Sequence, residues 1–480
     1  MNYRMIGYLL STVLLIEAAL LSIPMLCAAL YGESVLPFLY TIGILVAVAL
    51  PLFLAKPRQT RIFAKDGFVC VAASWLLLSA FGALPFVFSG TIPGYIDAFF
   101  ETVSGFTTTG ATILREVESL PKGILFWRSF THWVGGMGVL VFMLAILPSS
   151  DGRAIHLMRA EVPGPTKGKL VPKLRQTALI LYAIYMAFTL LETILLLCTG
   201  MPLYDSLVNT FATVGTGGFS VKNGSIGAYA NPAAEWIIAA FMLICGTNFN
   251  IFYFLLVKQL REIRKNEELR VYLFLTVASV AAIAINTWHM FEGIEPCLRA
   301  AFFQATTVMS TTGFATVDFS LFPALSKTVL LVLMITGASA GSTAGGLKIS
   351  RVLILIKGVW REIKQMLRPR SVNVTRLDGE PLSDETTRSA LGYLAIYALI
   401  LVSSVLLVSV DNFDFESNVT GVLACFNNVG PGLSAAVGPS GTFADFSIFS
   451  KLVLSLDMLF GRLEIMPMLI LFAPATWKRR

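Results

Sequence analysis

The feature that most constrains this chain is a polar stretch that occurs four times between apolar segments. The stretches read TVSGFTTTGAT (102–112), TFATVGTGGFS (210–220), ATTVMSTTGFAT (305–316) and VLACFNNVGPGLS (422–434). Each follows an apolar stretch too short to cross a membrane and precedes a long one. Runs this rich in Ser, Thr, Asn and Gly normally lie in water, so their position among apolar segments requires a structural reason.

The four stretches share one register when their glycines are set equal, at Gly110, Gly218, Gly313 and Gly430. Nine positions before the glycine, three of the four copies have a polar side chain, namely Glu101, Asn209 and Gln304. The residues just before the glycines are Thr108-Thr109, Thr216-Gly217, Thr311-Thr312 and Asn428-Val429. A short helix, a polar turn and a glycine, repeated in this way, indicate an internal repeat of one supersecondary unit.

Composition places these repeats in a membrane. Of 480 residues, 56% are hydrophobic and only 14% are charged, which is typical of a polytopic membrane protein. The net charge of +7 is attributed to Lys and Arg on the cytoplasmic side and not to nucleic-acid binding. The six cysteines and three histidines show no metal-ligand or catalytic spacing, so neither a metal site built on them nor an enzyme is expected.

The spacing of apolar segments predicts an all-α protein with ten spans. It divides the chain into an uncleaved N-terminal transmembrane hairpin (1–66) and four repeats, at 67–150, 151–257, 258–356 and 357–480. Each repeat contains a first spanning helix, a short helix with its polar loop, and a last helix. The last helices are expected near 124–147, 233–257, 327–356 and 446–475. Basic clusters near 56–65, 153–175, 258–270 and 357–376 all fall on one side, so both termini are predicted to be cytoplasmic.

Polar loops at membrane depth leave backbone groups unpaired at a cost of several kcal/mol each, unless they are buried in protein or line water. Four loops around one axis can present rings of oxygen atoms that replace the hydration shell of a cation. The alternative is that Gly and Thr only allow close helix packing. The candidate ion-binding residues are Thr108, Thr109, Gly110, Thr216, Gly217, Gly218, Thr311, Thr312, Gly313, Asn428, Val429 and Gly430.

These loops resemble the filter loops of the Trk/Ktr/HKT superfamily of cation transporters. RSFTHWVGGMGVL (128–140), GSTAGGLKISR (341–351) and GRLEI (461–465) are similar to the bacterial TrkH/TrkG membrane subunits in particular. The resemblance covers nearly the whole chain. It implies a potassium uptake or symport subunit of the bacterial inner membrane, with four pseudo-fourfold M1–P-loop–M2 repeats around one pore.

The resemblance also implies a homodimer in the lipid bilayer and a cytoplasmic nucleotide-binding partner, a TrkA-like ring. K⁺ would be the bound and transported ion, with no organic cofactor. Gly110 stands where Na⁺-favouring plant members often have Ser, which favours K⁺. The alternatives are a Na⁺-selective or Na⁺-coupled relative, or an alternating-access solute carrier, although a carrier predicts inverted repeats.

A second candidate element, the gate, lies in the last helix of the third repeat. Residues 337–346 are all Gly, Ala, Ser or Thr, a composition that holds a helix poorly. The resemblance implies a broken helix here, with a loop across the pore; the alternative is a continuous GxxxG packing helix. The candidate gate glycines are Gly337, Gly341, Gly345 and Gly346.

Two cations complete the candidate gate. Lys348 is expected to close the segment on the cytoplasmic side, where it could also anchor a helix end at lipid headgroups. Arg462 lies midway along an apolar helix, where a charge is costly and usually functional. The resemblance directs Arg462 toward the ion path; the alternative is pairing with Asp457 or Glu464 of a neighbouring helix.

Overall fold

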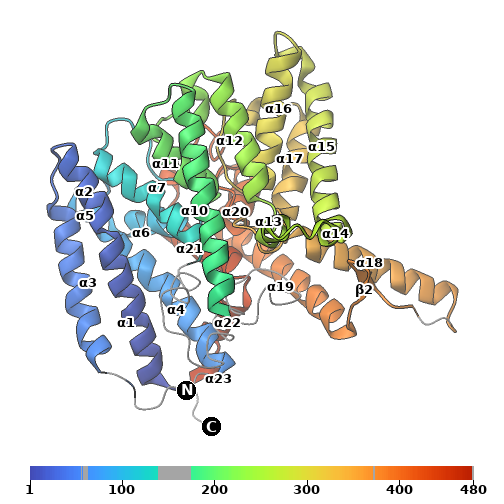
Figure 1. Ribbon diagram of the computed structural model, residues 1–480, viewed down its shortest axis with the longest axis horizontal. Helices are drawn as coiled ribbons and strands as arrows, with labels where there is room; N and C mark the ends of the chain where they lie inside the picture. Colours follow the sequence, from blue (N-terminus) through green and yellow to red (C-terminus); the bar gives the residue numbers. More distant parts are fainter. Residues whose placement is uncertain (56, 58–62, 139–173, 371–372, 478–480) are drawn as a thin grey trace.

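The computed structural model describes residues 1–55, 57, 63–138, 174–370 and 373–477, and within these its regular secondary structure consists of helices and one short β hairpin (Figure 1). The N-terminal part forms α1 (Tyr3–Leu20), α2 (Ser22–Leu30) and α3 (Leu36–Leu54), with α1 packed along α3 and α4. The expected boundary near residue 150 and the basic residues 153–173 lie outside the described residues.

Four short helices lead to the polar stretches: α6 (Tyr95–Phe106), α11 (Leu203–Val214), α16 (Ile294–Met309) and α20 (Phe415–Phe426). All four end at the same place, four residues before the aligned glycine. Each has a carboxylate in its first turn, namely Asp97, Asp205, Glu295 and Glu416. An acidic group is favourable there because it faces the positive end of the helix dipole. The negative ends therefore point toward the polar loops.

The polar loops after these helices are named loops 1 to 4. They are Thr107–Thr112, Gly215–Ser220, Ser310–Thr316 and Asn427–Ser434.

Long apolar helices precede the short ones: α4 (Ala64–Gly82) with α5 (Leu84–Phe88), α10 (Leu174–Cys198), α15 (Glu267–Thr287) and α19 (Asp384–Val408). With the N-terminal helices they make six segments in the described residues that are long and apolar enough to cross a membrane, or seven with one bent pair. The polytopic membrane architecture predicted from composition is confirmed. The count is below the ten predicted spans because the helices that follow loops 2, 3 and 4 are broken and residues 139–147 lie outside the described part of the chain.

The helices after loops 2 and 4 differ from the continuous ones predicted, and the helix after loop 3 has the break that the resemblance implies. α12 (Pro232–Cys245) and α13 (Phe249–Leu256) meet at an angle of 91°. α17 (Ala324–Thr336) and α18 (Ile349–Leu367) are separated by residues 337–348, which are not helical. α21 (Ile448–Arg462) gives way to α22 (Met466–Phe472) and α23 (Pro474–Trp477). α7 (Lys122–Gly136) covers the start of the predicted 124–147 helix, whose residues 139–147 lie outside the described part.

The backbone at two of these breaks has a distinct local geometry. Glu464 and Ile465, between α21 and α22, have φ values of 55° and 64°, which an α-helix does not accommodate. Asn248 accepts the N–H of Asn250 at 3.0 Å and so begins a new helix after the bend. Hydropathy does not report such breaks, because the broken helices remain apolar.

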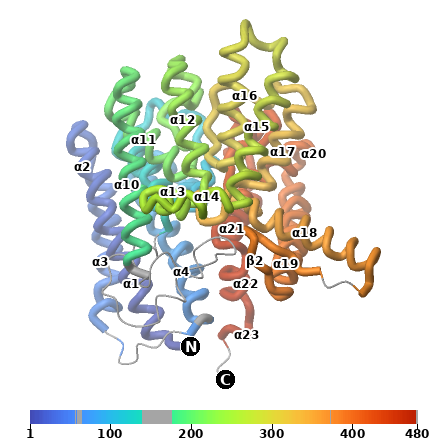
Figure 2. The backbone as a smooth tube through the Cα atoms, turned by 45° about the vertical axis from the view of Figure 1, so that its right-hand side comes forward, coloured from blue at the N-terminus to red at the C-terminus, as the bar shows by residue number. Residues whose placement is uncertain are grey.

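One two-stranded hairpin departs from the predicted all-α fold. β1 (Arg376–Leu377) pairs antiparallel with β2 (Glu380–Pro381) through the turn Asp378-Gly379, whose φ values are 56° and 82°. Two successive positive φ values match the tight hairpin turns for which Asp-Gly is favoured. α14 (Leu260–Lys265) precedes α15, and α13 and α14 run across the direction of α10 and α12 (Figure 2).

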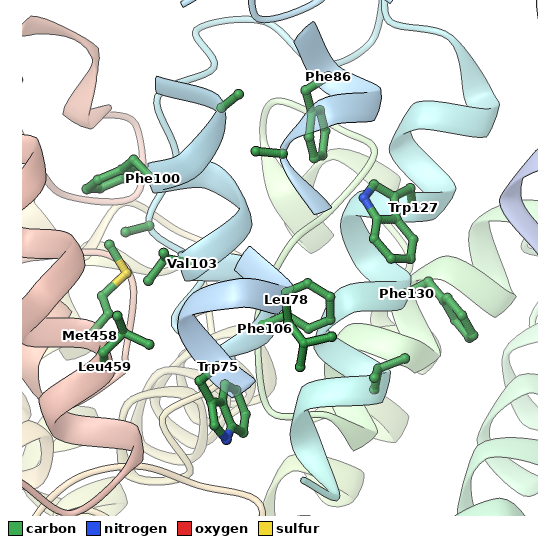
Figure 3. Close-up of a cluster of buried hydrophobic side chains, with 14 of the residues drawn as sticks. Trp75, Leu78, Phe86, Phe100, Val103, Phe106, Trp127, Phe130, Met458 and Leu459 are labelled. Carbon is green, nitrogen blue, oxygen red and sulfur yellow. The ribbon is translucent and has the colours of Figure 1, made fainter. Parts of the chain in front are cut away.

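The first short helix, α6, is enclosed by apolar side chains. Trp75 and Leu78 of α4, Trp127 and Phe130 of α7, and Met458 of α21 surround it (Figure 3). The Phe106 ring at its last residue lies 5.9 Å from the Trp127 ring, edge to face. This packing fixes the direction in which α6 delivers loop 1. Both chain termini lie at the same end of the molecule in Figures 1 and 2.

Candidate functional site

The four polar loops have the same unusual backbone. The residue two before each glycine has a positive φ: 54° at Thr108, 56° at Thr216, 56° at Thr311 and 55° at Asn428. The glycines follow with φ of 82°, 80°, 86° and 96° at Gly110, Gly218, Gly313 and Gly430. Left-handed residues two apart can aim successive carbonyl oxygens to one side. Thr and Asn rarely adopt this conformation, so the surrounding structure must hold it.

Backbone hydrogen bonds to the preceding helix hold each loop. The N–H of the residue before the glycine donates to the carbonyl five positions earlier in all four copies. The bonds are Thr109 to Ser104 at 2.9 Å, Gly217 to Ala212 at 2.7 Å, Thr312 to Thr307 at 2.9 Å and Val429 to Ala424 at 2.8 Å. They belong to the left-handed C-terminal caps that commonly end helices. The turn is therefore an extension of the helix end and not a free loop.

The loops contact one another in a closed cycle. A Cβ atom placed on any of the four glycines would meet the carbonyl oxygen just before the glycine of the next loop. The pairs are Gly110 with Gly217 at 2.1 Å, Gly218 with Thr312 at 2.1 Å, Gly313 with Val429 at 2.2 Å and Gly430 with Thr109 at 2.5 Å. Thus the structure brings the four candidate loops together in the order of the chain, and eight of the twelve candidate ion-binding residues take part in these contacts. The glycines leave no room for a side chain.

The polar residues nine positions before the glycines brace the chain after them. Glu101 accepts the N–H of Ile113 at 2.9 Å and forms a buried ion pair with Arg128 at 2.7 Å. In the second and third copies, Asn209 donates to Tyr229 at 3.1 Å and Gln304 donates to Thr316 at 3.2 Å. The alignment of the four stretches on their glycines predicted that Glu101, Asn209 and Gln304 occupy equivalent positions, but it did not identify Arg128 as the partner of Glu101. A lone Arg inside an apolar stretch is the signal that could have found it.

His132 of α7 packs between α6 and loop 2. Its Nδ1 lies 2.7 Å from the carbonyl oxygen of Gly105, and its ring is 4.1 Å from that of Phe219. A Cβ on Gly217 would lie 2.2 Å from the imidazole ring. His132 is fully buried between Gly105 of α6 and the Gly217 and Phe219 residues of loop 2.

The two ends of the loops face different surroundings. On the side of the glycines and the residues after them lies a cavity of about 410 Å³, lined by all four glycines. The 337–348 segment lies at the other end. The N–H of Gly345 donates to the Thr311 hydroxyl at 2.7 Å, and a Cβ on Gly345 would be 2.3 Å from the Asn427 carbonyl oxygen.

The 337–348 segment is irregular throughout, so the continuous GxxxG packing helix is excluded. Gly337, Gly341, Gly346 and Lys348 have φ of 64°, 72°, 77° and 73°. Lys348 is only 2% exposed, and its ammonium group donates to Gly345 O at 3.1 Å and also to Ala344 O. The alternative role for Lys348, anchoring a helix end at lipid headgroups, does not fit this geometry, because the side chain folds back onto the segment.

Arg462 connects the 337–348 segment to α7. Its guanidinium donates to Thr343 O at 2.6 Å, to Gly136 O at 2.9 Å and to Gly135 O. Asp457 instead accepts the Ser404 hydroxyl at 2.7 Å, and Glu464 pairs with Arg351. The contacts of Arg462 therefore link the first and last parts of the chain beneath the loops.

Comparison with known proteins identifies the family of this chain. Residues 38–479 match the TrkH family, described as cation transport protein. The chain belongs to this family. The Trk system potassium uptake protein TrkH of Salmonella typhimurium is 34% identical over 485 residues, with both chains fully covered. Trk system potassium uptake protein TrkG of Escherichia coli is 32% identical over 462 residues, covering 95% of this chain and 94% of TrkG.

A solved structure of a family member has the same fold as this chain. The crystal structure of the potassium transporter TrkH from Vibrio parahaemolyticus matches with a TM-score of 0.90 and 30% identity, and both chains are covered completely. The resemblance drawn from sequence motifs is thereby confirmed, as is the prediction that the chain is a transporter and not an enzyme. TrkH-family membership and the apolar helices establish a multi-pass bacterial membrane protein.

Proposed function

We propose that this chain is the ion-translocating subunit of a Trk-type potassium uptake system in the bacterial inner membrane. The observation that carries the proposal is the closed cycle of contacts among the four glycines and their neighbouring carbonyls. Membership of the TrkH family and the potassium transport named for its relatives support the choice of ion.

In this proposal the twelve loop residues form the selectivity filter. Carbonyl oxygens of loops 1 to 4 replace the hydration shell of K⁺, and the negative ends of α6, α11, α16 and α20 favour a cation at the centre. The cavity at the glycine end is the outer mouth of the pore. The repeats are those expected from the sequence, at 67–150, 151–257, 258–356 and 357–480, after the hairpin 1–66.

The 337–348 segment is the gate, lying across the path beneath the filter. Its contact with Thr311, a filter residue, supports this assignment. Arg462 places a permanent cation beside the segment, where it repels K⁺ in a low-dielectric pore. Lys348 holds the segment in its folded form through the Ala344 and Gly345 carbonyls.

The orientation and partners complete the proposal. Both termini, which lie at one end of the molecule, are cytoplasmic by the distribution of Lys and Arg. The protein works as a homodimer, and a cytoplasmic nucleotide-binding ring docks on the basic regions 153–175, 258–270 and 357–376 and moves the gate.

The test is growth and K⁺ uptake in a bacterial strain that lacks its own potassium uptake systems, followed by flux measurements in liposomes with K⁺ and Na⁺ in competition. Restored growth at low K⁺, with K⁺ flux preferred over Na⁺, is the expected result. Na⁺ flux that K⁺ does not displace would instead assign the chain to the Na⁺-selective branch of the superfamily.

A further inference from the structure

Both ends of the 337–348 segment meet at one carboxylate that the sequence did not single out. Oε1 of Glu268, in the first turn of α15, accepts the N–H of Ala340 at 2.7 Å and the N–H of Ser350 at 3.1 Å. Ala340 is near the start of the segment, and Ser350 is just beyond its end. Glu268 itself is only 6% exposed. A buried carboxylate shared by two backbone donors in this way joins the entry and the exit of one irregular segment.

The base of the segment is also closed by its own backbone. Ile349 donates to Ala338 O at 3.1 Å, and Leu347 donates to Ile335 O at 3.3 Å. A Cβ on Gly337 would lie 2.7 Å from Gly345 O and 3.1 Å from Gly346 Cα. The segment is therefore a loop with a narrow neck, and Glu268 binds across that neck from a different helix.

The beginning of α15 is in turn tied to the β hairpin and α18. The N–H of Glu267 donates to Asp378 in the hairpin turn at 2.9 Å. The Glu267 carboxylate pairs with Lys357 of α18, and Lys357 also donates to Arg376 O at 2.9 Å. α18 and the hairpin project away from the rest of the molecule (Figure 1). A displacement of these projecting elements therefore acts directly on the turn that carries Glu268.

We infer that Glu268 is a latch that holds the neck of the 337–348 segment closed and passes movement of the hairpin and α18 to it. The inference rests on the proposed role of the segment as the gate. Hydrogen bonds to an ionised acceptor are roughly twice as strong as those between neutral groups, so the carboxylate favours the closed neck. Pulling the first turn of α15 away breaks both bonds at once.

The experiment compares Glu268→Gln with wild type, using the full chain in liposomes without any partner protein. The amide retains an acceptor oxygen but loses the charge. We expect basal K⁺ flux to rise about tenfold, which corresponds to roughly 1.4 kcal/mol between closed and open necks. The K⁺/Na⁺ ratio should not change, because the latch does not touch the filter loops. Glu262→Gln, an exposed carboxylate on α14 paired with Lys265, is the matched control and should leave flux unchanged.

A second variant distinguishes failure of the Glu268 latch from failure of the proposed gate at 337–348. Deletion of residues 338–344 joins Gly337 to Gly345, which already lie in contact, and removes one of the two donors to Glu268. Raised flux in the deletion with wild-type flux in a stably folded Glu268→Gln would overturn the latch and leave the gate standing. Unchanged flux in a stably folded deletion would overturn the gate, and the latch with it. Thermal unfolding of each purified variant establishes that the protein is folded.

Discussion

At the scale of single residues, the four aligned loop glycines meet two requirements at once. Their φ values of 80–96° favour glycine, and the neighbouring carbonyl occupies the position of a Cβ atom. Thr108, Thr216, Thr311 and Asn428 meet only the first requirement, since side chains are tolerated there. A substitution at the glycines should therefore disturb the geometry of the ring, whereas most substitutions elsewhere in the chain should not.

Gly110→Ser tests this requirement. The new Cβ would lie 2.1 Å from the Gly217 carbonyl oxygen, so loops 1 and 2 must separate and their oxygens move off axis. We expect the K⁺/Na⁺ flux ratio to fall at least tenfold, or roughly 1.4 kcal/mol. Gly392→Ser is the control, because nothing lies within 4 Å of the added atom. Equal K⁺/Na⁺ ratios in Gly110→Ser and wild type would remove Gly110 from the filter. Gly135 would be a poor control, since its Cβ would strike the Phe106 carbonyl at 1.8 Å.

Arg462→Ala should raise K⁺ flux on the order of tenfold without changing the K⁺/Na⁺ ratio. The substitution removes a fixed positive charge from the proposed ion path and frees the Thr343 carbonyl of the 337–348 segment. Arg462→Lys keeps the charge, but an ammonium group lacks the planar set of donors with which the guanidinium reaches three carbonyls. The K⁺ flux of Arg462→Lys should therefore lie between those of wild type and Arg462→Ala. The measurement is K⁺ and Na⁺ flux in liposomes. Unchanged or lower flux in a stable Arg462→Ala protein would exclude the barrier role.

At the scale of the elements, prediction from sequence succeeded where a pattern recurs. The ends of α6, α11, α16 and α20 follow from the aligned glycines, and the irregular 337–348 segment was implied by the family resemblance of a stretch whose composition holds a helix poorly. The bend between α12 and α13 and the break after Arg462 were not predicted. They depend on contacts between distant parts of the chain, such as Phe249 N–H with Gly341 O at 3.1 Å, that hydropathy does not reveal. Glu268 was missed for the same reason, because it lies at the end of an ordinary apolar helix.

The bend before α13 gives a prediction of its own. Asn248→Ala removes the cap of α13 and a side chain that adjoins Gly341, so both the bend and the segment should loosen. We expect a loss of about 1 kcal/mol in stability and a rise in basal K⁺ flux. Asn231→Ala removes the cap of α12 in the same way but far from the segment, and should lower stability alone. Similar flux in the two variants would show that the bend does not support the gate.

At the scale of the whole molecule, ion pairs link the start of one post-loop helix to the short helix of the next repeat. Glu235 of α12 pairs with Arg299 of α16 at 2.9 Å, and Lys327 of α17 pairs with Glu416 of α20 at 2.7 Å. Lys451 of α21 pairs with Asp97 of α6, also at 2.7 Å, across a sequence separation of 354 residues. The last of these links α21, which follows loop 4, back to α6, which precedes loop 1, and so it accompanies the contact between Gly430 and the Thr109 carbonyl oxygen that closes the cycle of loops.

The closing pair predicts a test of the assembled ring. The Lys451 side chain is 7% exposed, so Asp97→Lys should leave two cations facing each other in a largely buried position. We expect a loss on the order of 1–3 kcal/mol in stability. The K⁺/Na⁺ flux ratio should also fall, because α6 holds loop 1 in place. Adding Lys451→Asp restores an opposite-charge pair in reversed order and should recover much of both properties. The matched control is the same charge exchange at the ion pair of Arg115 and Asp445. This pair also joins the first and last parts of the chain, but its side chains are 70% and 63% exposed, so the exchange should change stability by less than about 1 kcal/mol.

Thermal unfolding of the four variants of each cycle gives the coupling energy, and liposome flux gives the K⁺/Na⁺ ratio. A coupling energy no larger at Lys451–Asp97 than at Arg115–Asp445 would show that the ring is held closed by its apolar packing around α6 and not by this pair.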